Sequence, residues 1–135
     1  MNHSIARAEG YSPSFVYEQE YIEGFSVLMN PQILLQKSVA QLVRDELSRQ
    51  LKAIIRVMPE EPMRTMRQVN IWVEWNDADN GAALFHPSEV WLSQNGYNPN
   101  KAGGIEISNA TNFVKWSQNE QPWMVLHELT HAYHF

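Results

Sequence analysis

Apolar residues recur at every third or fourth position between residues 35 and 58, and this run constrains the fold more than any other feature of the sequence. Its members are Leu35, Val39, Leu42, Val43, Leu47, Leu51, Ile54 and Met58. This spacing places them along one face of an α-helix, and such a face is normally buried. Asn30-Pro31 offers a capping residue and a proline suited to the first helical position, although Ser38 is an alternative start. The sequence predicts an amphipathic helix over about residues 32–58.

Strand patterns flank this helix. Residues 20–29 alternate with Tyr21, Phe25, Val27 and Met29 on one side, which predicts one strand. Residues 69–75 are β-branched and aromatic and predict a central strand, and residues 105–108 predict a short alternating strand. Residues 76–104 contain four glycines and predict a long irregular stretch built around turns. With a last helix over about residues 122–134, the predicted class is α/β (α+β), a small mixed sheet packed with a long and a C-terminal helix.

Composition narrows the class of function. The chain has 135 residues, 44% of them hydrophobic, which favours one globular domain over residues 1–135 with a loosely structured lead-in at 1–19. Its ten Lys and Arg residues are scattered, so we expect no nucleic-acid partner. No apolar run is long enough to cross a membrane, and residues 1–7 lack the apolar core of a signal peptide. Without cysteine, a zinc site must use His and carboxylates, and secreted and cytoplasmic locations are not distinguished.

The sequence His127-Glu128-Leu129-Thr130-His131 is the pattern that carries chemistry. Residues four apart share one helical face, so the two imidazoles can bind one zinc ion. Glu128 follows roughly 100° around the helix, where it can act as a base toward a water without binding the metal. Val125, Leu129 and Ala132 lie on the opposite, apolar side. The pattern predicts His127 and His131 as metal ligands and Glu128 as the catalytic residue, and the alternative is two surface histidines on an amphipathic helix.

The other histidines are weaker candidates. His134 shares the face of His127 but lies about 10 Å away along the helix axis at 1.5 Å per residue, too far to bind the same ion. His86 is expected to be a hydrogen-bonded loop residue, and His3 is expected to be incidental. The acidic run over residues 76–81 resembles a calcium loop, but its oxygens miss the required register, so we expect a plain turn there.

The segment over residues 123–134 resembles the metal helix of zincin metallopeptidases. It is similar to the gluzincin group and, within it, to the anthrax lethal factor-like branch. The resemblance implies a zincin-like N-terminal subdomain, a Zn²⁺ cofactor and a peptide or protein substrate. It also implies that an edge strand pairs with the substrate backbone, and it places that strand at residues Ile105, Glu106, Ile107 and Ser108.

Two functions remain open from the sequence. The first is a hydrolase, a zinc metallopeptidase truncated after its metal helix, whose third zinc ligand is supplied by a C-terminal part beyond residue 135. The second is a catalytically inactive zincin-like module that binds peptide or has a structural role. We expect the chain alone to be weakly active or inactive, because a catalytic zinc site normally takes three protein ligands.

Overall fold

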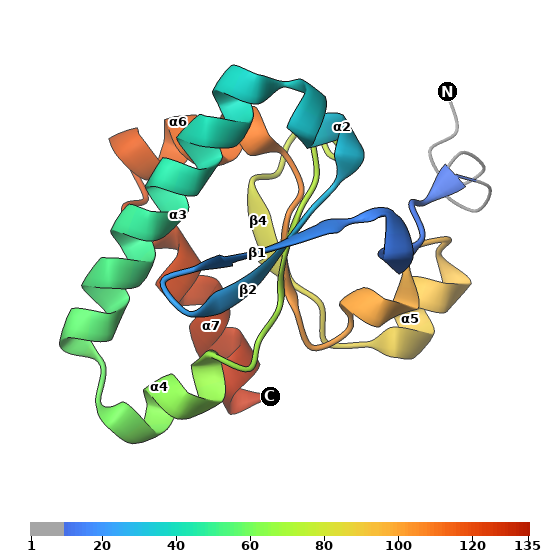
Figure 1. The fold of residues 1–135 in the computed structure, drawn as a ribbon. Helices are drawn as coiled ribbons and strands as arrows, with labels where there is room; N and C mark the ends of the chain where they lie inside the picture. Colours follow the sequence, from blue (N-terminus) through green and yellow to red (C-terminus); the bar gives the residue numbers. More distant parts are fainter. Residues whose placement is uncertain (1–9) are drawn as a thin grey trace.

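A five-stranded mixed sheet lies at the centre of the computed structural model, which describes residues 10–135 (Figure 1). Its spatial order is β1-β2-β3-β5-β4. The strands β2, β3 and β5 run parallel, whereas β1 and β4 pair antiparallel at the two edges. Their bounds are β1 (Glu18–Ile22), β2 (Phe25–Met29), β3 (Ile71–Val73), β4 (Ala83–Phe85) and β5 (Ile105–Ile107). The predicted mixed sheet is confirmed.

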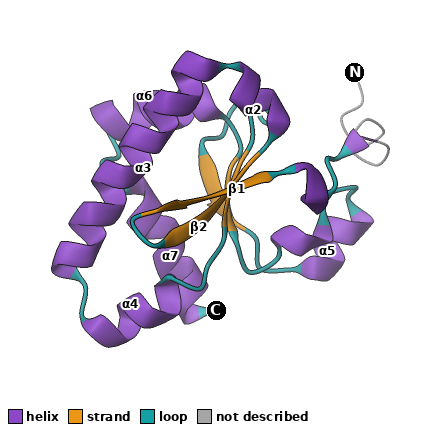
Figure 2. Ribbon diagram, in the orientation of Figure 1, coloured by secondary structure: helices purple, strands orange, loops and turns teal. Residues whose placement is uncertain are grey.

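The two faces of the sheet carry different layers (Figure 2). One face is covered by the long helix and its neighbours: α3 (Lys37–Val57), α4 (Glu60–Met66), α6 (Ala110–Asn119) and the C-terminal helix α7 (Met124–His134). The opposite side carries the short elements η1 (Ser14–Val16), α5 (Glu89–Gln94) and η2 (Pro99–Lys101). The predicted fold class, with a long helix on the sheet and a helix at the C-terminus, is confirmed.

Alternation along the strands divides the side chains between these layers. Ile71, Val73, Ile105 and Ile107 point into the helical layer and belong to one buried apolar core. The residues between them, such as Trp72 and Glu106, point to the other face, because successive strand residues face opposite sides. The core of the molecule therefore lies on the α3–α7 side, and the other face carries buried polar groups.

The long helix is divided near its start. α2 (Pro31–Leu35) and α3 are separated at Gln36, whose φ and ψ of −91° and 70° are not helical. The Asn30 side chain accepts a hydrogen bond from the backbone N–H of Gln32 and caps α2, as predicted. The alternative start is also nearly right, because α3 begins at Lys37, one residue before Ser38. The predicted apolar face is buried at Val43, Leu47, Leu51 and Ile54, whereas Leu35 and Leu42 lie beside it and are exposed.

The single strand predicted over residues 20–29 is wrong. It is a hairpin in which β1 turns back into β2 at Glu23 and Gly24, whose φ angles are 51° and 84°. A two-residue turn with both φ angles positive matches the right-handed twist of paired strands, and glycine adopts that conformation at little cost. Consequently Tyr21 does not share the buried face of Phe25 and Val27, and it is 71% exposed.

Three more segments differ from the prediction. The long stretch 76–104 contains β4, α5 and η2, and α6 fills a segment for which no element was predicted. Residues 1–9 of the predicted lead-in, including His3, lie outside the described part of the chain, whereas residues 14–22 form η1 and β1. Among the described helices, none has the length and apolar character needed to cross a membrane.

Candidate functional site

The helix that carries the HExxH sequence is held by a buried polar contact with α3. Gln50 is fully buried, and its side-chain oxygen accepts a hydrogen bond of 2.9 Å from the backbone N–H of Val125 in the first turn of α7. Its amide nitrogen donates to Ser117 on α6 and to Glu46 on α3. The first N–H groups of a helix have no partner within the helix, so Gln50 satisfies one of them and fixes the start of α7.

The apolar side of α7 packs into the core as predicted. Val125 and Leu129 are 1% and 0% exposed, and Ala132 is partly buried. Packing on this side leaves the other side of the helix toward solvent, where His127 and His131 are both exposed. The position of the two histidines therefore follows from which residues the helix buries.

The two imidazoles converge. The Nε2 atoms of His127 and His131 are 3.2 Å apart, and the ring planes are nearly perpendicular at 89°. Two ligands at ~2.0–2.1 Å from a tetrahedral zinc ion are themselves roughly 3.3 Å apart, so this separation fits a shared zinc ion. His134 points elsewhere, since its ring packs on Tyr133.

Glu128 lies beside the edge strand β4. Burial raises the pKa of its carboxyl above the ordinary value, while His127, His131 and a hydrogen bond from the backbone of Phe85 lower it; the net effect is a raised pKa. The hydrogen bond places the carboxylate of the HExxH sequence next to the backbone of β4. The Glu128 carboxylate is therefore held between the helix that carries the two histidines and the edge strand.

The substrate strand predicted at residues 105–108 is wrong in its position. β5 lies between β3 and β4, and Ile105, Glu106, Ile107 and Ser108 are all buried. The free edge next to α7 belongs to β4, which the sequence did not predict. β4 was missed because Ala83-Leu84-Phe85 neither alternates between apolar and polar residues nor contains a β-branched residue, unlike the equally short strands β3 and β5.

The backbone of β4 turns alternate N–H and C=O groups to its outer side. Ala82 and His86 bond inward to the β5 segment, since the N–H of Ser108 donates to Ala82 and the N–H of His86 donates to Gly104. Alternate residues of an antiparallel strand point their N–H and C=O groups to opposite sides, so Ala83 and Phe85 point theirs outward. The N–H of Phe85 donates to Glu128, and the other outward groups are the ones that a further strand would bond.

A buried network of charges lies on the sheet face opposite α7. Lys101 Nζ is 2.8 Å from a Glu74 oxygen and 3.2 Å from Glu106 Oε1, and all three residues are at most 3% exposed. Asn30 donates to Glu74 at 2.8 Å, and the Tyr17 hydroxyl also donates to it. The sequence offered a signal for the two carboxylates, because each interrupts an otherwise apolar strand. It offered none for Lys101, which ends the short helix η2 just before Gly103 and Gly104.

Burial and the neighbouring charged groups together set the pKa values of the two buried glutamates in this network. The pKa of Glu74 lies above its ordinary value, first because the group is buried and further because Asp77 and Glu106 repel its charge, despite the opposing effect of Lys101. Burial also acts to raise the pKa of Glu106, but its hydrogen bond with His86 and the Lys101 ammonium dominate and the pKa is lowered. Glu106 is therefore held ionised.

His86 is a hydrogen-bonded residue, as predicted. It is 4% exposed, and its Nε2 lies 2.7 Å from Glu106 Oε1. Glu74, Asp77 and Glu106 form the one group of three possible metal ligands found within residues 10–135. The ammonium of Lys101 lies against two of these three carboxylates, so a cation of the protein itself already neutralises part of their charge. Within the same residues, no third His, Asp or Glu side chain forms such a group with His127 and His131.

Comparisons of the chain with protein-family models, with curated proteins and with solved structures found no match.

Proposed function

We propose that this chain carries the metal helix and substrate edge of a zinc-dependent metallopeptidase of the zincin type. The observation that carries the proposal is the 3.2 Å separation of the His127 and His131 Nε2 atoms, which fits two ligands of one zinc ion. The partly exposed position of the pair leaves room for a substrate. Zinc bound there would act as a Lewis acid toward a carbonyl oxygen and would acidify a water molecule.

Glu128 is the proposed base. Its carboxylate follows His127 on the helix and lies beside β4, where it can accept a proton from the attacking water and pass it to the leaving amine. A peptide extended along the edge of β4 would bond the outward N–H and C=O groups of Ala83 and the C=O group of Phe85, because the N–H of Phe85 donates to Glu128. Strand addition of this kind gives affinity that depends little on side chains, and it would present the scissile bond to Glu128.

The third protein ligand is proposed to come from polypeptide beyond the described residues. Two imidazoles alone should hold zinc loosely, because catalytic zinc sites normally take three protein ligands. Among residues 10–135, no third ligand lies with His127 and His131. This observation also favours the second candidate function, a catalytically inactive zincin-like module that binds a peptide along β4.

Zinc-dependent peptide cleavage tests the proposal. A longer chain that contains this sequence and supplies an acidic ligand should cleave a mixed peptide library, read by mass spectrometry, and a zinc chelator should stop it until zinc is restored. The 135-residue chain alone should cleave far more slowly. A longer chain that binds zinc through three protein ligands yet cleaves nothing would contradict the peptidase and favour the binding module. Fast, chelator-sensitive cleavage by the 135-residue chain would contradict the need for a further ligand.

A further inference from the structure

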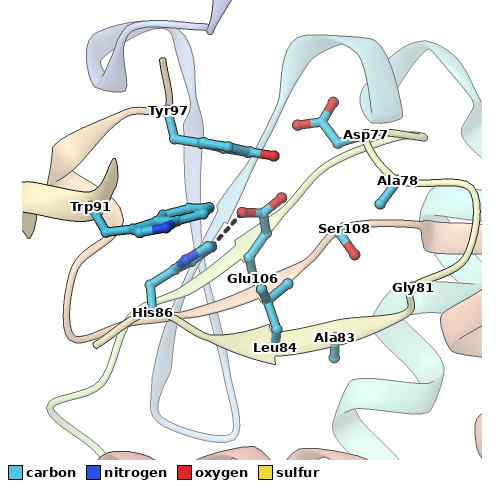
Figure 3. Close-up of a pocket in the computed structure, with 10 residues that line it drawn as sticks. All are labelled: Asp77, Ala78, Gly81, Ala83, Leu84, His86, Trp91, Tyr97, Glu106 and Ser108. Atoms are coloured by element: carbon cyan, nitrogen blue, oxygen red, sulfur yellow. Dashed lines mark hydrogen bonds and ion pairs between the residues drawn. The ribbon is translucent and has the colours of Figure 1, made fainter. Parts of the chain in front are cut away.

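A cavity of about 220 Å³ lies on the face of β4 and β5 that is turned away from the metal helix (Figure 3). Leu84 and Glu106 are cross-strand partners, so both side chains point to this face. Leu84 and Trp91 line the cavity and are 39% and 50% exposed, so its open side lies between the edge strand and α5. The cavity is smaller than the ~300–1,000 Å³ of sites for drug-sized ligands, whereas an apolar cavity of ~150 Å³ is enough to hold benzene. Its volume therefore suits one large side chain.

The walls beside the opening are aromatic and apolar. The rings of Trp91 and Tyr97 stack with their centroids 5.4 Å apart and an angle of 26° between the planes. Figure 3 shows these rings on one side of the cavity and the loop that carries Ala78 and Gly81 on another, with Leu84 on the strand between them. Aromatic rings attract other rings in offset-stacked or edge-to-face pairs, so these walls favour an apolar or aromatic occupant.

The polar groups at the inner end of the cavity already have partners within the protein. His86 Nε2 lies 2.7 Å from Glu106 Oε1, and Lys101 Nζ lies 3.2 Å from the same oxygen. Asp77 is also partnered, and Figure 3 shows its carboxylate at the end away from Leu84. Glu106 and His86 are only 2% and 4% exposed, so an occupant removes almost no further water from them. An occupant therefore needs no charged group of its own to satisfy this end of the cavity.

We propose that this cavity is a specificity pocket for a large apolar side chain, such as that of phenylalanine, in a peptide bound along β4. The inference rests on the proposed addition of a peptide strand to β4. Filling the cavity removes apolar surface of both the peptide and the protein from water, which is favourable. The pocket adds selectivity to the pairing of backbones, which by itself depends little on side chains.

The geometry of strand pairing selects one residue of the peptide. A residue opposite Leu84 points its side chain to the cavity face, whereas its neighbours, opposite Ala83 and Phe85, point toward α7. A strand paired with β4 lies one strand spacing, roughly 4.8 Å, from it. The selected side chain therefore stands beside Leu84 at the open side of the cavity. A phenylalanine ring extends from there toward Trp91, whereas the methyl group of an alanine ends beside Leu84.

Binding measured without zinc tests the pocket separately from catalysis. The probes are acetylated pentapeptide amides with phenylalanine, glutamine or alanine at the centre and alanine elsewhere, together with N-acetylphenylalanine amide. Calorimetry with the 135-residue chain reports the affinities. The phenylalanine peptide is expected to bind about tenfold or more tightly than the glutamine and alanine peptides, because burial of one phenylalanine side chain contributes at least that factor.

Two variants locate the binding. Ala78→Leu fills the cavity and should weaken the phenylalanine peptide about tenfold without changing the affinity for the alanine peptide. Trp91→Ala removes an aromatic wall and should weaken the phenylalanine peptide about fivefold. The matched controls Ala53→Leu, on α3, and Trp123→Ala, an exposed tryptophan, lie outside the cavity and should change little. Circular dichroism of each variant confirms that it is folded before its affinity is compared.

The remaining outcomes separate the pocket from the proposed peptidase. Equal affinity for the phenylalanine and alanine peptides would overturn the pocket while leaving strand addition and catalysis in place. A glutamine peptide that binds as tightly as the phenylalanine peptide would overturn the apolar character of the pocket, and no binding by any peptide would overturn strand addition as well.

N-acetylphenylalanine amide decides whether the occupant belongs to a strand. Binding of this compound with the same affinity as the peptide would overturn the assignment to a β4-paired strand, and it would indicate a small apolar ligand. Phenylalanine-selective binding that Ala78→Leu and Trp91→Ala both weaken supports the inference even if the longer chain cleaves no peptide.

Discussion

Replacing Glu128 with glutamine is expected to lower peptide cleavage at saturating substrate by ~10²–10⁴-fold, the range attributed to a positioned general base. Glutamine keeps the size of the side chain and can still contact the β4 backbone, but it cannot take up a proton. Zinc affinity should stay nearly unchanged, because Glu128 is assigned as a base and not as a ligand. The measurement is the turnover of zinc-loaded Glu128→Gln in the longer chain that supplies a third ligand, together with its zinc affinity by calorimetry.

Glu120→Gln provides the matched control. It removes the same charge from an exposed carboxyl at the end of α6, outside the candidate site, and should leave turnover unchanged. Cleavage that persists at the normal rate in Glu128→Gln would refute the assigned mechanism. A large loss of zinc affinity would instead make Glu128 a ligand.

Replacing Lys101 with methionine is expected to lower the free energy of unfolding by ~3–5 kcal/mol at neutral pH. Methionine fills a similar volume, but Glu74 and Glu106 then remain buried without the ammonium that lies 2.8 and 3.2 Å from them. The urea midpoint of unfolding measures the effect. Lys115→Met, on the exposed side of α6, removes the same charge and should change the midpoint little.

The decrease in the free energy of unfolding caused by Lys101→Met should become smaller as the pH falls. Burial already raises the pKa of Glu74, and removal of the Lys101 ammonium, which opposes that shift, should raise it further above its value in the unfolded chain. A raised pKa in the folded state means stability that is present at low pH and lost as the pH rises, so Lys101→Met should recover stability relative to the unmodified protein as the pH falls from neutral toward the ordinary range of a carboxyl group. A midpoint equal to that of Lys115→Met at neutral pH would show that the network contributes nothing to stability.

Periodicity predicted the elements whose side chains repeat over several turns or strand positions. The run from Val39 to Met58 gave α3 because a helix of 21 residues contains enough repeats to be distinguished from chance. α7 was predicted from Pro122 and the apolar positions Val125 and Leu129. Short elements carry little such repeat, and β3 was predicted from its β-branched and aromatic residues and β5 from one alternation of isoleucine and glutamate. β4 has three residues and α5 has six, and both were missed inside a glycine-rich stretch.

α6 and the hairpin had usable local signals. Asn109 caps α6 by accepting a hydrogen bond from the N–H of Asn112, and Phe113 and Val114 follow at core positions, a pattern that predicts a helix start. Glu23-Gly24 stands at the centre of an alternating run, where a glycine favours a turn. Each of these two signals depends on only one or two residues. The prediction followed the longer repeating patterns instead, and it therefore missed both the hairpin and α6.

The candidate site also has one part that the sequence predicts and another part that depends on the tertiary fold. The pair His127 and His131 follows from helical geometry alone, because four residues make about one turn. The strand beside Glu128 does not follow from helical geometry, because the order of the strands in the sheet decides which strand forms the edge. The sequence alone placed β5 at this edge instead of β4. The charge network and the cavity join residues as far apart as Tyr17 and Lys101, and no spacing in the sequence encodes those contacts.

Zinc location by anomalous X-ray scattering tests the central claim most directly. Crystals of the 135-residue chain soaked in zinc, with data collected on both sides of the zinc absorption edge, should show one strong peak at ~2.0–2.1 Å from the Nε2 atoms of both His127 and His131. The same experiment with His127→Ala should lose that peak, whereas His134→Ala should keep it. A peak at Glu74, Asp77 and Glu106 instead, or no peak between His127 and His131, would contradict the account.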